Sequence, residues 1–380
     1  MYISMNNLIC IPCLLTGGTE IQTLNLVQAL VEGRHRVVTV CYFEHSSEMV
    51  ERFKQAGSEV VLLNTKGKRI GGWKGVRFLY KGLRKVVRKE HPGVVHVQYM
   101  APGAIPILLL RLLGVKQIIA TTHTAADIYP NLRLVHFIQR HCVRAFICIT
   151  KRAEQSFFGN SQLYDEQTAL KKRNHFTIYN ALPQHFANVS VPQRNYGQQI
   201  TIGVVSRLEK IKGMDLVVPA FAQVIKKHPS VRLVVVGDGS LRAFMQQQAE
   251  ALKCFEHIEW VGRQPQEALP NWYRRIDIVW MPSRSEGFGL TAIEAMACGC
   301  VMVASRIGGL PEVVPENEVG LLHEPESIEN ITLKTCSLIE NPIFMRNLAG
   351  KAHDYVQRFS FKRYAELQNN LYSKISRQSL

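Results

Sequence analysis

The sequence lacks the features of disulfide-stabilised, secreted or membrane-spanning chains. Its nine cysteines are irregularly spaced, which excludes a disulfide framework, and the lone C-x-x-C at Cys10 and Cys13 has no second pair to complete a zinc site. The apolar run at residues 105–113 is too short for a membrane span and contains Arg111. No secretory signal segment is visible. These absences predict a protein of the reducing cytoplasm, with any membrane contact peripheral, at the inner face of the cell membrane.

Length and patterning predict two α/β domains. The chain has 380 residues, more than a domain with a single hydrophobic core usually contains. Its hydrophobic content of 46% is ample for globular folding. Strand-like and helix-like segments alternate throughout, as in parallel sheets covered by helices, and such sheets bind ligands at the carboxyl ends of their strands. The polar stretch at 190–199 is typical of a linker. We therefore expect domains at 1–190 and 195–360, followed by a C-terminal helix with an apolar stripe within 361–380.

The segment from Pro282 to Met296, PSRSEGFGLTAIEAM, has the composition of a ligand site. A continuous apolar run precedes it, as in a buried strand, and LTAIEAMA after it favours a helix. A strand, glycine loop and helix in this order point the free N–H groups of the first helical turn at a bound phosphate. Glu286 and Glu294 flank this turn, where each could accept hydrogen bonds from vicinal hydroxyls. Two carboxylates beside a phosphate cradle indicate a nucleotide sugar.

Two upstream junctions support this interpretation. ITIGVVSRLEKIKG reads as a strand followed by a loop with Arg207 and Lys212, cations placed to neutralise a diphosphate. VRLVVVGDGS is a further buried strand that ends in a glycine turn at Gly237 and Gly239.

These motifs resemble glycosyltransferase family 4, whose members are retaining enzymes with the GT-B fold. The resemblance rests on RLEKIKG, GDGS, IEWVGR and SEGFGLTAIEAMACGCVMVAS in the second half, and on TGGTEIQTLNLVQALVEGRHRVVTV, HPGVVHVQ and TTHTAAD in the first. Ser206 departs from the family pattern, which usually has glycine there. The resemblance implies two Rossmann-like, doubly wound parallel-sheet domains facing across a cleft. It also implies that the C-terminal helix packs back on the N-terminal domain.

The resemblance also implies roles for individual residues. Arg207, Lys212, Glu286 and His123 become the expected catalytic residues, with His123 contacting the donor sugar. Glu20 and Asp127 are further candidates in the N-terminal half. The expected donor-binding residues are Glu294, Gly287, Phe288, Gly289, Leu290, Thr291, Gly237, Gly262, Arg263, Gly17 and Gly18.

No Asp-x-Asp occurs in the chain, so the commonest motif for holding a divalent metal on a diphosphate is missing. We therefore expect metal-independent chemistry without a cofactor, in which preorganised cations and helix N–H groups stabilise the leaving diphosphate. Retention would ordinarily suggest a carboxylate nucleophile. The resemblance implies instead front-face attack by the acceptor hydroxyl, whose proton passes to the departing phosphate oxygen.

Positive charge is concentrated in the first half. Residues 1–190 hold 24 basic and 11 acidic residues, and residues 191–380 hold 22 and 19. Residues 66–89 contain ten basic residues and no acidic one. On a helix over 74–89 the apolar residues fall on one arc, and Phe78 falls among the charges of the opposite arc. The cations of that arc are Lys74, Arg77, Lys81, Arg84, Lys85 and Arg88. This helix is either a solvated surface or a docking face for an anionic membrane.

The membrane interpretation favours a lipid-linked glycan as acceptor, with a role in cell-surface polysaccharide synthesis and transfer of a hexosyl or N-acetylhexosaminyl group. Uridine diphosphate sugars are the first expectation for the donor and guanosine diphosphate mannose the second. Soluble acceptors, as in sucrose, trehalose or glycogen synthesis, remain open. So does an enzyme of the same fold that rearranges a nucleotide sugar, such as a hexosamine 2-epimerase. Nucleic-acid binding is disfavoured, because no recognisable reading module is present.

Overall fold

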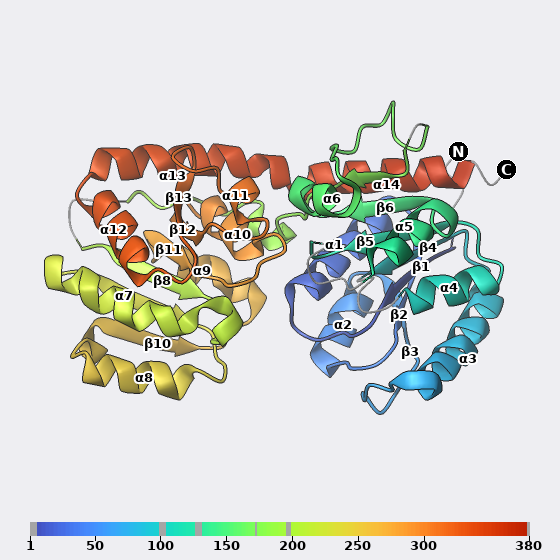
Figure 1. The fold of residues 1–380 in the computed structure, drawn as a ribbon, viewed down its shortest axis with the longest axis horizontal. Coiled ribbons are helices and arrows are strands. Elements are labelled where there is room, and N and C mark those ends of the chain that lie inside the picture. The colour runs from blue at the N-terminus through green and yellow to red at the C-terminus, as the bar shows by residue number, and fades with distance from the viewer. Residues whose placement is uncertain (1–5, 99–103, 126–130, 172, 195–198, 378–380) are drawn as a thin grey trace. The chain divides into compact units, whose positions relative to one another are not determined.

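Two α/β units make up the structure, a computed structural model that describes residues 6–98, 104–125, 131–171, 173–194 and 199–377 (Figure 1). Unit 1 comprises residues 1–181 and 361–380, and unit 2 comprises residues 182–360. The division after Ala181 lies upstream of the predicted boundary at 190, because Leu182 donates its N–H to the Phe359 carbonyl of unit 2 at 2.8 Å. Part of the predicted linker, residues 195–198, lies outside the described residues.

Unit 1 is built on a seven-stranded parallel sheet in the order β3-β2-β1-β4-β5-β6-β7. Its core strands are almost continuously buried, as expected of a sheet covered on both faces. One apolar core lies under α1, α2 and α14, and the other lies under α3 to α6. The elements are β1 Asn6–Ile11, α1 Gly18–Glu32, β2 Arg36–Cys41, α2 Ser47–Gln55, β3 Ser58–Leu62, α3 Gly72–Glu90, β4 Val94–Gln98, α4 Ile105–Leu112, β5 Ile118–Thr122, α5 Leu132–His141, β6 Ala145–Cys148, α6 Lys151–Phe158, β7 His175–Thr177 and α14 Phe361–Arg377.

Unit 2 repeats this plan with a six-stranded parallel sheet in the order β10-β9-β8-β11-β12-β13. Helix α7 packs beside α8 and α12, and α10 packs beside α9, α11 and α13. The elements are β8 Thr201–Val205, α7 Met214–Lys227, β9 Arg232–Val236, α8 Arg242–Ala251, β10 Ile258–Gly262, α9 Leu269–Tyr273, β11 Ile278–Met281, α10 Leu290–Ala297, β12 Val301–Ser305, α11 Leu310–Val313, β13 Gly320–His323, α12 Ile328–Ile339 and α13 Pro342–Val356.

Strand order fixes where ligands can bind in each unit. In unit 2 the chain leaves β8 toward β9 on one side, while β11, on the other side of β8, continues to β12. The connections after β8 and β11 therefore run to opposite sides of the sheet, and the carboxyl edge of this strand pair is the switch point where such sheets bind ligands. In unit 1 the corresponding pair is β1 and β4.

Helix α14 belongs to unit 1 although it is the last element of the chain. Its buried residues Leu371, Tyr372 and Ile375 join the core under α1. Gly33, at the end of α1, makes this approach possible, because a Cβ there would lie 2.1 Å from the Asn369 side-chain oxygen of α14. The helix predicted within 361–380 is confirmed.

The helix predicted over 74–89 is also confirmed, as α3, but the predicted place of Phe78 is wrong. All the cations of the predicted arc are exposed, while Leu79, Leu83 and Val86 are buried. Phe78 does not stand among the charges, since its ring stacks on that of Phe43 at 6.2 Å and packs against the core. Phe78 lies at the border between the basic and apolar faces of α3, so its ring can turn toward Phe43, which follows β2. Among the described residues, no helix is long and apolar enough to cross a bilayer.

Arg284 ties together the loops that follow β8 and β11 in unit 2. Its guanidinium donates to both carboxylate oxygens of Asp215, at 2.6 and 2.9 Å, and to both of Glu326, at 2.5 and 2.7 Å. It also donates to the Lys210 carbonyl at 2.5 Å. The hydrogen bonds that Arg284 donates to Asp215, and then those to Glu326, raise the pKa of Arg284 above its usual value. The Arg284 and Asp215 side chains are only 19% and 23% exposed, so water screens this pair weakly, whereas the Glu326 side chain is 55% exposed.

We predict that Arg284→Ala lowers the thermal unfolding midpoint of the protein markedly. The change leaves Asp215 without its bidentate partner in a partly buried position, at a cost of about 1–3 kcal/mol. Arg275→Ala is the matched control, because Arg275 makes a bidentate pair with Glu259 in which the two side chains are 52% and 45% exposed. Exposed pairs contribute about 0–1 kcal/mol. Equal losses in calorimetric midpoint for the two variants would contradict this account.

Candidate functional site

The carboxyl edge of β8 and β11 brings two of the predicted catalytic residues into contact. Lys212 closes the loop after β8, and Glu286 lies in the loop after β11. Lys212 Nζ donates to Glu286 Oε2 at 2.7 Å, and the two side chains are 21% and 14% exposed. The loops can meet because Gly213 adopts φ +69°, where a Cβ would lie 1.9 Å from the Pro282 carbonyl oxygen. The sequence motifs thus produce a cation and an anion side by side at the switch point.

Glu294 lies on α10, buried behind this edge. Glu294 as a whole residue is only 3% exposed. The Tyr273 hydroxyl donates a hydrogen bond to Glu294 Oε2 at 2.9 Å. Burial raises the Glu294 pKa from 4.5 to about 7, with the Tyr273 hydrogen bond acting in the opposite direction. The hydrogen bond engages one carboxylate oxygen, so the group retains acceptor capacity for a ligand hydroxyl.

The glycine loop before α10 has the predicted order of strand, loop and helix. Gly289 caps the helix at φ +107°, and a Cβ there would lie 2.7 Å from the Leu310 side chain. The N–H groups of Leu290 and Thr291 begin the helix, where they have no intrahelical acceptor. The Thr291 hydroxyl donates to the Val205 carbonyl at 3.3 Å and so anchors α10 to the end of β8.

Other predicted donor-binding side chains have a packing role in the structure. The Phe288 ring is buried edge-on against Phe359, at 5.5 Å. Gly287 precedes it in the same loop. Gly237 adopts φ +137° and lies against the loop after β8, where a Cβ would sit 1.8 Å from the Ser206 oxygen. Its N–H donates to the Gly262 carbonyl at 2.9 Å.

Two arginines lie exposed at the same edge of unit 2. Arg207 follows β8, and Arg263 follows β10, at the edge strand of the sheet. Arg207 lies near Glu209, whose carboxylate accepts hydrogen bonds from the Ser240 hydroxyl and N–H, at 2.6 and 3.0 Å. Arg207 and Lys212 therefore lie on one loop that is fixed by its neighbours.

Unit 1 holds the remaining predicted residues. Gly17 is the N-cap of α1, and Gly18 is the first residue of that helix. A Cβ on Gly17 would lie 2.6 Å from Glu20 Oε2, and Glu20 Oε1 accepts a hydrogen bond from the Cys13 thiol at 3.2 Å. The candidate Asp127 lies outside the described residues.

His123 follows β5 and is a buried, neutral imidazole. Burial lowers its pKa to about 4. Its Nε2 lies 3.0 Å from Gln98 Oε1, an oxygen that only accepts, so Nε2 carries the proton and Nδ1 is an acceptor. At neutral pH the residue can bind a hydroxyl group but cannot act as a general acid.

Sequence reasoning missed the residues that hold these groups in place. Arg284 lies inside the quoted motif, but its partners Asp215 and Glu326 are distant in sequence. Gln98 ends β4, and pairing of β4 with β5 brings it beside His123. A polar residue at the end of an apolar strand is the signal that could have singled out Gln98. Tyr273 carries no such signal.

Glu294 predicts a measurable dependence of stability on pH. Since its folded pKa of about 7 exceeds the ordinary 4.5, the folded chain holds a proton that the unfolded chain releases, and stability falls as pH rises through this window. Glu294→Gln removes this loss, so the variant should gain in unfolding midpoint relative to wild type at pH 8 more than at pH 5. The full pKa shift of Glu294 corresponds to a change in unfolding free energy on the order of 3 kcal/mol.

Glu316→Gln is the control for this measurement. Burial acts to raise the Glu316 pKa, but its pairs with Arg306 and Lys334 hold it below the usual value. Its contribution to stability is complete above about pH 4.5 and is lost only as pH falls through the lower folded pKa. The control should therefore lose unfolding midpoint by a similar amount at pH 5 and pH 8. A flat profile for Glu294→Gln relative to wild type would show that the carboxyl is ionised when buried.

Two models of glycosyltransferase families match the chain, one in each half. The family model described as Glycosyl transferases group 1 matches residues 187–355, and that described as Glycosyltransferase Family 4 matches residues 16–160. A D-inositol 3-phosphate glycosyltransferase from Segniliparus rotundus is 29% identical over 315 residues, which cover 75% of this chain and 67% of the relative.

Solved structures confirm the predicted GT-B fold of two Rossmann-like, parallel-sheet domains. A glycosyltransferase from Rickettsia africae ESF-5 superposes with a TM-score of 0.79 at 19% identity, covering 98% of this chain and 99% of that one. HepE of Anabaena, solved in complex with UDP-glucose, superposes with a TM-score of 0.76 at 18% identity. The superposition covers 97% of this chain and 100% of HepE. The first half of the chain thus matches a family 4 glycosyltransferase domain, and the second half matches a group 1 glycosyl transferase domain.

Proposed function

We propose that the protein transfers a hexosyl or N-acetylhexosaminyl group from a nucleoside diphosphate sugar to a glycan, and that unit 2 binds the donor. The observation that carries the proposal is the contact between Lys212 and Glu286 beside the amino end of α10. A cation and free helix N–H groups suit a diphosphate, while the carboxylate suits sugar hydroxyls. Glu294 is assigned to the ribose. The complex of HepE with UDP-glucose supports uridine as the base.

In the proposed reaction the bond between the anomeric carbon and the diphosphate oxygen breaks, and the acceptor oxygen bonds to the same face of that carbon. The acceptor proton passes to the departing phosphate oxygen, and configuration is retained. Arg207, Lys212 and the N–H groups at Leu290 and Thr291 stabilise the growing negative charge, which removes the need for a metal at this position. His123 binds a substrate hydroxyl through its unprotonated Nδ1. The matched family descriptions name transferases, which favours transfer over the epimerase alternative.

We predict that Arg207→Ala and Lys212→Ala each lower kcat by about two orders of magnitude, since each removes a donor that strengthens as the leaving group gains charge. Glu294→Ala should instead weaken nucleotide binding by roughly 1.5–3 kcal/mol. Calorimetric titration with UDP, GDP and ADP identifies the base and measures this loss.

Lys226→Ala serves as the control for these variants, because Lys226 is an exposed cation at the opposite end of α7 from Lys212. Its rate should equal that of wild type, and EDTA should leave turnover unchanged. Unaltered transfer by the Arg207 and Lys212 variants, or strict dependence on added magnesium or manganese, would refute the assignment.

The acceptor is proposed to be lipid-linked, in cell-surface polysaccharide synthesis, because unit 1 carries a surface suited to an anionic membrane. The cations of α3 form one exposed face, and Trp73 at its first turn is 87% exposed. Helix α4 packs beside α3 and leaves Ile105, Leu108 and Leu112 exposed at helical spacing. Basic side chains next to apolar ones match the headgroup and acyl boundary of a bilayer.

We predict that the triple reversal Lys81→Glu, Arg84→Glu and Lys85→Glu reduces co-sedimentation with acidic vesicles at least tenfold. Wild-type binding should fall as salt rises, because exposed charges are screened over about 10 Å at 0.1 M. Neutral vesicles should bind poorly.

The matched control reverses three exposed cations of unit 2, Lys226, Arg232 and Lys253, for the same change in net charge. It should sediment like wild type, and UDP affinity should be unchanged in both triple variants. If the α3 variant still sediments like wild type, α3 is a solvated surface and the membrane-bound acceptor loses its support.

A further inference from the structure

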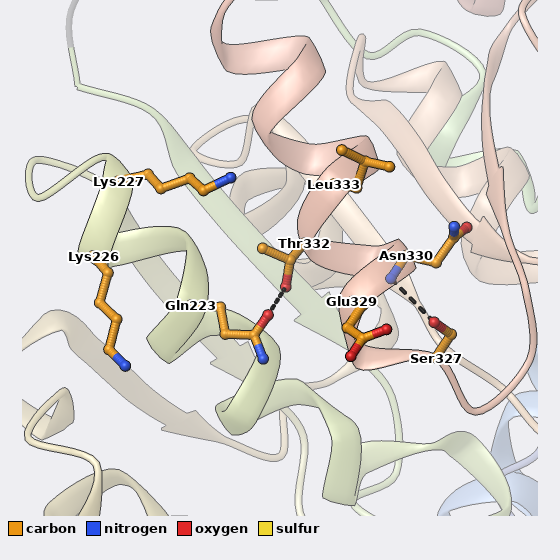
Figure 2. A pocket seen from close by; sticks show the side chains of 8 residues that line it. All are labelled: Gln223, Lys226, Lys227, Ser327, Glu329, Asn330, Thr332 and Leu333. Carbon is orange, nitrogen blue, oxygen red and sulfur yellow. Dashed lines mark hydrogen bonds between the residues drawn. The ribbon is translucent and has the colours of Figure 1, made fainter.

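Helices α7 and α12 of unit 2 run side by side in the same direction. The Thr332 hydroxyl of α12 lies against Ala220 and Gln223 of α7, donating to Gln223 Oε1 at 3.2 Å. Figure 2 shows this bond among the side chains that line a pocket along the seam between the helices. The pocket has a volume of about 580 Å³. The pocket is lined by Gln223, Lys226, Lys227, Ser327, Glu329, Asn330, Thr332 and Leu333. The seam continues past Lys227 to a different group of side chains.

Three side chains with metal-binding atoms meet where the two helices end. His228 is the C-cap of α7, Cys336 lies on α12, and Glu340 is the C-cap of α12. The nitrogen, sulfur and oxygen ligand atoms all lie within 4.8 Å of one another, and His228 Nε2 lies 3.3 Å from Glu340 Oε1. Cys336 and Glu340 are four positions apart, which places them on one side of the helix.

The histidine nitrogen in this group is buried without a hydrogen bond. His228 Nε2 is shielded from solvent, and its geometry toward Glu340 does not make a hydrogen bond despite the short distance. A buried polar atom without a partner is rare in folded proteins and calls for one. A metal ion between the three ligand atoms would supply that partner.

We propose that His228, Cys336 and Glu340 bind one Zn²⁺ ion, with water in the fourth position. Imidazole, thiolate and carboxylate are the ligands that zinc takes, whereas Mg²⁺ and Ca²⁺ prefer oxygen alone. Tetrahedral bonds of 2.0–2.3 Å place neighbouring ligand atoms about 3.3–3.8 Å apart. The present separations reach this range with a shift of about 1 Å, which the 60% exposed Glu340 side chain can make.

The ion would join the carboxyl ends of α7 and α12 and stabilise unit 2. Helix α7 has 14 residues, so this end lies about 20 Å from the Lys212 loop at its other end. Metal binding here is therefore separate from the donor chemistry. EDTA should lower the unfolding midpoint of zinc-loaded protein without changing affinity for UDP.

Cobalt titration of metal-free protein tests the site. Co²⁺ bound through Cys336 should give a near-ultraviolet thiolate charge-transfer band that saturates at one ion per chain and disappears on addition of Zn²⁺. Glu340→Gln and His228→Gln should each weaken cobalt binding at least tenfold, and Cys336→Ser should abolish the band. Excess Zn²⁺ should raise the thermal midpoint of wild type by a few degrees.

Two control variants separate this site from adventitious binding. Cys13→Ser changes the cysteine that is least buried, and Glu329→Gln changes an exposed carboxylate at the other end of α12. Both should keep the wild-type band. Because Cys336 is buried and its variant could fail to fold, the decision rests on the Glu340 and His228 variants. Absence of a saturable band in wild type, or a band unchanged in those two variants, would overturn the proposal.

Discussion

The carboxyl edge of unit 2 depends on direct contact between backbones, which glycine alone permits. Gly213, Gly237 and Gly308 all have positive φ, and a Cβ on each would lie within 1.9 Å of a carbonyl oxygen, those of Pro282, Ser206 and Glu286 respectively. A side chain at any of these positions would force two loops apart. Lys212 and Glu286 meet because the backbones beneath them already touch, so the charged pair is a result of the packing. Arg284 then fixes the same loops through its side chain.

Sequence could predict the elements whose signal is local. Continuous apolar runs identified the parallel strands, since both faces of each sheet are covered. The amphipathic patterns of α3 and α14 identified these helices and their buried sides. The order of strand, glycine loop and helix around Gly289 predicted the start of α10. In each case the determining residues lie within about twenty positions, so periodicity and turn chemistry suffice.

Sequence could not predict features decided by distant neighbours. The burial of Glu294 against Tyr273 depends on how α9 packs beside α10, and it changes the carboxyl from an exposed acceptor into a group with a raised pKa. Phe78 lies between two faces of its helix, and Phe43 decides which face it joins. His228 and Cys336 come together only because α7 and α12 run in parallel on the assembled sheet.

The return of α14 to unit 1 has a consequence for synthesis of the chain. His96 is a buried histidine of β4, and its Nδ1 lies 2.8 Å from the Tyr372 hydroxyl of α14. Until α14 leaves the ribosome, this nitrogen lacks its partner and the face of α1 that packs on α14 is uncovered. The first unit to be translated is therefore the last to be completed, after the whole of unit 2 has emerged. The nascent chain must keep an open core from aggregating for that interval, a requirement that a simple tandem of two domains would not face.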